Sequence, residues 1–104
     1  MGKYYAVTSL VFELRYKEHV IDISICDSII KDADFVVDLM DCASRAIANG
    51  FDYAGIVLKN INDLYNSYIE TDDVDLIHKF EEIKDCVNII NMKYIFKQIR
   101  EANE

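Results

Sequence analysis

The chain contains no proline, no tryptophan and only three glycines. Long loops normally use proline and glycine, so we expect short connections between the secondary-structure elements. No apolar run approaches the roughly 18 residues that a membrane span needs, and the first residues lack the basic and apolar regions of a signal peptide. At 104 residues the length fits one domain, 1–104. These absences predict a small globular protein that does not bind a membrane.

Catalytic motifs are missing as well. The sequence has no G-x-S-x-G, no H-E-x-x-H and no glycine loop for phosphate. The two histidines, His19 and His78, have no neighbouring Cys or His at the spacing of zinc ligands. Cys26, Cys42 and Cys86 are widely spaced and odd in number, so we expect free thiols and a reducing compartment, the cytoplasm. These observations favour a binding protein over an enzyme, with no metal and no cofactor.

The net charge of −8 is concentrated in the middle of the chain. Between Asp22 and Asp75, twelve acids and three bases give a net charge of −9, while the other seven acids and eight bases give +1. Such a field repels nucleic acid and attracts basic surfaces. We therefore expect no direct binding to nucleic acid and a protein partner with a basic surface.

Apolar and polar residues alternate in two runs near the N-terminus, which predicts an antiparallel β-hairpin over residues 9–26. A four-residue loop from Tyr16 to His19 keeps every apolar residue on one face. A single long helix is the alternative, but it would place Glu18 within the apolar stripe. The predicted hairpin pairs are Leu14 with Ile21, Phe12 with Ile23, and Leu10 with Ile25.

A helix over residues 33–49 is the central element. Asp32 or Asp34 can cap its start, and Asn49 with Gly50 gives a strong stop. At 100° per residue it has two faces. The apolar face, which we expect to be buried, contains Val36, Leu39, Met40, Ala43, Ala46 and Ile47. The other face contains Asp34, Asp38, Asp41 and Arg45.

Three further helices are predicted, over residues 53–70, 73–88 and 91–101. The first has a 3.6-residue apolar period and a cap at Asp52, although Ile56 falls on its polar side. In the last two, a second apolar stripe begins after Asn91, about 140° around from the first on a straight helix. Either the helix breaks near Asn88 or Asn91, or one continuous helix exposes this stripe to a partner. The expected fold class is α+β, an antiparallel hairpin packed on three to four helices.

Two sets of residues are candidate binding surfaces. The aspartates can be a solvated helix face, a metal site that lacks a wrapping loop, or a docking face for a basic partner. That acidic face consists of Asp22, Asp27, Asp34, Asp38 and Asp41. The apolar stripe, which can bind a partner or form a homodimer, consists of Met92, Ile95, Phe96 and Ile99.

In size, charge and composition, though not in any motif, the chain resembles the anti-CRISPR proteins that phages encode against bacterial defence. The resemblance assigns a role to no residue. It implies a cytoplasmic inhibitor that mimics nucleic acid and covers the basic surface of a nucleic-acid-processing effector. An immunity protein that neutralises a toxin, a homodimeric interaction or sensor module, and a small enzyme with a cleft built from distant residues are the alternatives.

Overall fold

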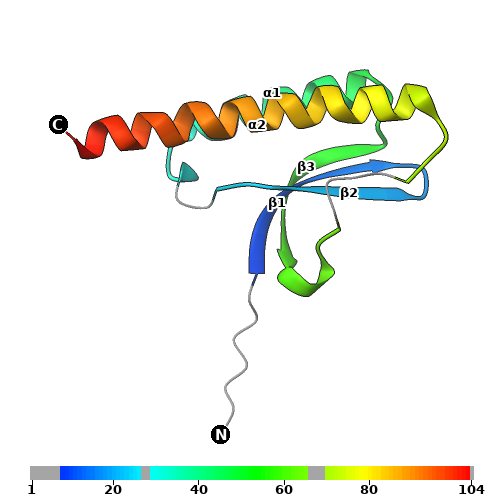
Figure 1. Ribbon diagram of the computed structural model, residues 1–104, viewed down its shortest axis with the longest axis horizontal. Coiled ribbons are helices and arrows are strands. Elements are labelled where there is room, and N and C mark those ends of the chain that lie inside the picture. Colours follow the sequence, from blue (N-terminus) through cyan, green and yellow to red (C-terminus); the bar gives the residue numbers. More distant parts are fainter. Residues whose placement is uncertain (1–7, 27–28, 66–69, 104) are drawn as a thin grey trace, which may run out of the picture.

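A computed structural model of the chain describes residues 8–26, 29–65 and 70–103. Figure 1 shows a three-stranded antiparallel sheet with two α-helices running side by side along one side of it. The α+β class is confirmed, but these residues form two α-helices and not three or four. The elements in chain order are β1 (Thr8–Tyr16), β2 (His19–Ser24), α1 (Ala33–Ala48), β3 (Tyr53–Asn60), a short 3-10 helix η2 (Ile61–Asp63) and α2 (Val74–Ala102).

The hairpin of β1 and β2 has the predicted register. Leu14 pairs with Ile21 and Phe12 with Ile23, and the Ile25 N–H donates to the Leu10 carbonyl at 3.0 Å. One face of the pair is therefore apolar and lies in the core.

The predicted four-residue turn is wrong. Tyr16 pairs with His19, so only Lys17 and Glu18 form the loop, and Lys17 takes a left-handed φ of 52°. The Lys17 N–H donates to the carboxylate of Asp52, which offsets the cost of that backbone conformation. Asp52 thus holds the hairpin turn and does not cap a helix.

The helix predicted over residues 53–70 is also wrong, because residues 53–60 form β3. This strand pairs antiparallel with the free edge of β1, which makes β1 the central strand in the order β2-β1-β3. Ile56, the residue that did not fit the helical pattern, lies opposite Phe12. Tertiary pairing with β1 overrides the local helical period here.

Both helices place one face on the sheet. The core cluster takes Phe12 and Leu14 from the sheet, Phe35 and Leu39 from α1, and Phe80 from α2. Caps define the helix ends as expected. For α1, Asp32 accepts from the Asp34 N–H at 2.9 Å, and Gly50 after the helix has φ +101°. Asp73 caps α2.

The buried face of α1 differs from the predicted one. Met40 and Ile47, expected inside, are 51% and 49% exposed, while Phe35 and Cys42 are buried. The rotation follows from α2, because the Phe35 ring packs edge-on against Tyr94 at 5.1 Å between centroids. The sequence pattern alone did not show where this second helix would lie.

Helix α2 has no break at Asn88 or Asn91 and continues for 29 residues, about 43 Å at 1.5 Å per residue. The expected break is therefore wrong, and the exposed second stripe is what the structure shows. The last turns of α2 extend past α1 and the sheet (Figure 1).

The expectation of free thiols at Cys42 and Cys86 is wrong, because these two residues form a disulfide between α1 and α2. Cys26 takes no part in this bond. The cysteine argument for a reducing compartment loses its basis, since disulfides persist mainly in oxidising environments. Neither α1 nor α2 is long and apolar enough to cross a membrane.

Candidate interaction surfaces

The aspartates of α1 lie on the flank that faces α2. Asp34 and Asp41 are exposed. Asp38 is partly covered, because its carboxylate accepts from the Tyr94 hydroxyl at 2.8 Å and lies 3.5 Å from the Lys93 amine. The neighbouring basic residues of α2 thus reduce the negative potential of this flank.

Tyr94 and Lys97 connect α2 to the start of α1. The Lys97 amine lies 2.9 Å from the carboxylate of Asp32, and this hydrogen bond lowers the pKa of Asp32 and raises the pKa of Lys97. Burial, together with the hydrogen bond to Asp38, raises the pKa of Tyr94 to about 12. Tyr94 therefore stays a neutral donor at physiological pH, and Asp32 stays charged.

Asp22 lies apart from the α1 aspartates. It is on β2, where its side chain is 1% exposed, and its carboxylate lies 3.2 Å from the Lys59 amine. The same amine lies 2.7 Å from Glu13. Burial lowers the pKa of Lys59, but the hydrogen bonds to Glu13 and Asp22 outweigh this effect, and the pKa is raised. Asp22 is thus a buried member of an ion cluster that joins the three strands. Asp27 lies outside the described residues.

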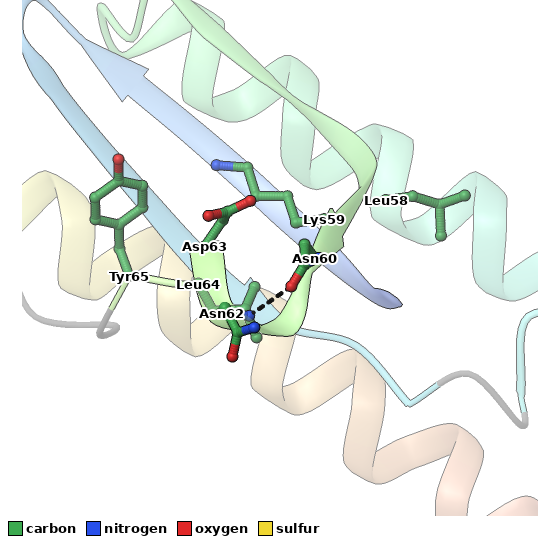
Figure 2. A pocket seen from close by; sticks show the side chains of 7 residues that line it. All are labelled: Leu58, Lys59, Asn60, Asn62, Asp63, Leu64 and Tyr65. Carbon is green, nitrogen blue, oxygen red and sulfur yellow. Dashed lines mark hydrogen bonds between the residues drawn. The ribbon is translucent and has the colours of Figure 1, made fainter. Parts of the chain in front are cut away.

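A shallow hollow of about 530 Å³ opens beside the end of β3 and η2. Figure 2 shows Lys59 and Tyr65 on the same side of this segment, while Leu58 points away. Lys59 is committed to Glu13 and Asp22, and Asn60 accepts from the Asn62 N–H at 2.9 Å to begin η2. Lys59 and Asn60 are thus engaged in contacts that hold the local fold.

The apolar stripe of α2 is the most extended exposed feature that the sequence predicted. Met92, Phe96 and Ile99 are 49%, 56% and 52% exposed, whereas Ile95 is half-buried. Ile89, which the prediction missed, is 67% exposed. These residues repeat at intervals of three, four and three, the spacing of a coiled-coil seam. We call Ile89, Met92, Phe96 and Ile99 the α2 seam.

The α2 seam lies almost opposite the buried face of its helix. At 100° per residue, the seam residues cluster about 180° around from the buried residues Phe80, Ile83, Val87 and Tyr94. Among the described residues, the packing that holds α2 on the sheet therefore leaves the seam uncovered. The spacing from Ile89 onward was visible in the sequence, but the expected break at Asn91 divided it.

Within the described residues, no three side chains of His, Cys, Asp or Glu meet in a group that could hold a metal ion. Comparison of the chain with protein-family models, with curated proteins and with solved structures finds no match. The function must therefore be argued from the surfaces themselves.

Proposed function

We propose that this protein acts by binding another protein through the α2 seam and not by catalysis. The observation that carries the proposal is the second apolar face of α2, four large side chains each about half exposed or more. A helix on the surface of a domain needs only one apolar stripe to pack on its core. Because exposed apolar side chains that form one contiguous patch mark interaction sites, the second stripe supports a partner that covers it.

A helix of the partner fits the shape of this surface. The seam runs over eleven residues, from Ile89 to Ile99, about 15 Å, with the spacing at which one helix inserts side chains between those of another. Phe96, two residues from its centre, is an aromatic side chain of the kind that anchors protein interfaces.

Site-specific photo-crosslinking tests the proposal. A photoreactive phenylalanine analogue replaces Met92 in one variant and Met40 in the control, since both are helical methionines of nearly equal exposure, 49% and 51%. We expect irradiation of cells to link the position 92 variant to a protein and the position 40 variant not. Equal or absent products at the two positions would contradict the proposal.

The second candidate is the inhibitor that covers a basic, nucleic-acid-binding surface. It is supported by the net charge of −8 and by Asp34 and Asp41, which are exposed and have no ion pair among the described residues. A bacterial cytoplasm is where such an inhibitor would act, although the Cys42–Cys86 bond favours an oxidising compartment.

Affinity capture from a bacterial lysate tests this candidate. The captured complex should weaken sharply as salt is added, because exposed charges are screened within about 8 Å at physiological ionic strength. The Asp34→Asn/Asp41→Asn variant should lose binding as well. A complex that is insensitive to both changes would rule the inhibitor out.

A further inference from the structure

We infer that the α2 seam binds a second copy of this chain, with the two α2 helices antiparallel about a two-fold axis. This inference rests on the function proposed above, because it names the partner of the same surface. It commits to one occupant, a twin helix that presents the same four side chains in reverse order.

The spacing of the seam is symmetric about the level of Tyr94. Ile89 and Ile99 lie five residues on either side of that level, and Met92 and Phe96 lie two residues on either side. In an antiparallel pair, Ile89 therefore meets Ile99 of the second copy, and Met92 meets Phe96. A two-fold interface requires such self-complementarity, because the same patch serves both subunits.

The charges of α2 favour the antiparallel arrangement. Its first half contains Asp75, Glu81, Glu82 and Asp85 with two lysines, and its second half contains Lys93, Lys97 and Arg100 with Glu101. A parallel pair would place like charges together along both halves, which is unfavourable. An antiparallel pair centred on the level of Tyr94 brings Asp85 of one copy near Arg100 of the other, while Asp75, Glu81 and Glu82 lie beyond the end of the second helix.

One ion pair at each end of the seam follows from this geometry. Asp85 lies nine residues before the centre and Arg100 six residues after it, so the two differ by three residues, about 4.5 Å along the axis. An arginine side chain spans this distance. Both residues are exposed, and neither has an ion pair among the described residues. The two copies of Lys93 would lie near the two-fold axis, on the same side of the interface. Each amine is 3.5 Å from the carboxylate of Asp38 in its own chain, which reduces the repulsion between them.

The shape of the molecule leaves room for the second helix. Tyr94 is the last buried residue of α2, and the last turns of the helix extend past the sheet (Figure 1). The seam lies on the side of α2 opposite its buried face, so a second helix that covers the seam does not meet the sheet. Because the seam is about 15 Å long, shorter than a standard interface requires, we expect a dissociation constant of about 10–100 µM.

Sedimentation equilibrium of the full chain tests the inference. We expect a species of twice the 12.1 kDa chain mass at concentrations of several hundred micromolar. Met92→Glu should remain monomeric with an unchanged far-ultraviolet circular dichroism spectrum, and Met40→Glu should dimerise like the wild type. A wild-type chain that stays monomeric throughout this range would overturn the inference.

Charge reversal tests the antiparallel arrangement. Asp85→Arg and Arg100→Asp should each weaken the dimer by about tenfold, and the double variant should recover most of the affinity. Failure of this recovery would refute the arrangement. If the chain is monomeric while photo-crosslinking at position 92 captures a different protein, the inferred self-association is refuted and the proposed function is supported. If no product forms at position 92 at all, both the self-association and the proposed function are refuted.

Discussion

The ion cluster of Lys59 with Glu13 and Asp22 allows a quantitative test of the fold. Its amine lies 2.7 Å from Glu13 and 3.2 Å from Asp22, and the side chains of Lys59, Glu13 and Asp22 are 18%, 11% and 1% exposed. Lys59→Met keeps most of the side-chain volume but removes the charge that both carboxylates face. Removing one partner of a buried ion pair costs about 3–5 kcal/mol. Arg15 still lies 3.2 Å from Glu13, so we expect the lower end, about 3 kcal/mol.

Urea unfolding at pH 7 measures the free energy of unfolding that Lys59→Met loses. A loss of about 3 kcal/mol also corresponds to a melting temperature lower by roughly 12–24 °C. Lys79→Met is the control, because Asp75, its partner at 3.7 Å, is 83% exposed, so the loss of this pair should cost under about 0.5 kcal/mol. The triple variant Glu13→Gln/Asp22→Asn/Lys59→Met leaves no buried charge without a partner, so its stability should return to within about 1 kcal/mol of wild type. A Lys59→Met variant as stable as Lys79→Met, or a triple variant no better than the single one, would refute the reasoning.

Three further predictions concern the contacts between α1 and α2. Removing the disulfide as Cys42→Ala/Cys86→Ala should lower the free energy of unfolding by about 4 kcal/mol, given its 44-residue separation, and dithiothreitol should destabilise only the wild type. In an ultraviolet titration, one tyrosine should ionise near pH 12 and be missing in Tyr94→Phe. Because its folded pKa is raised, Tyr94 should stabilise the fold fully below pH 10 and lose this effect as pH rises toward 12. Asp32 has a lowered folded pKa, so its contribution is present above its ordinary value of 3.8 and is lost as pH falls below it. Asp32→Asn, which keeps a capping side chain, should show a smaller loss of stability in acid unfolding.

Local patterns in the sequence predicted those parts of the fold that local forces determine. The hairpin register follows from the alternation of apolar residues, and the ends of α1 and α2 follow from Asp32, Gly50 and Asp73. All of these depend on residues within about fifteen positions of one another. The same local patterns could not show that residues 53–60 complete a sheet with β1, more than thirty positions earlier.

The candidate surfaces divide in the same way. The period of the α2 seam is local, so Met92, Phe96 and Ile99 could be identified from the sequence. Whether the aspartates form one acidic face depends on which basic residues come near them in space. The structure does not keep the predicted members of this face together. Asp22 is buried against Lys59, and Asp38 is covered by Tyr94. The pairing of Cys42 with Cys86 likewise depends on how two helices pack.

The order of the sheet has a consequence for how the chain folds. The central strand finds β2 across a two-residue turn, but its pairs with β3 are between 38 and 52 positions apart. A hairpin closes within microseconds, whereas contacts between distant segments form more slowly because a longer loop must be ordered first. For that interval the nascent hairpin presents a bare edge on β1, a template for pairing with another chain. Refolding yield should therefore fall with protein concentration. Because α1 lies between β2 and β3 in the chain, its formation brings β3 close to β1, and the pairing of β3 then covers this edge.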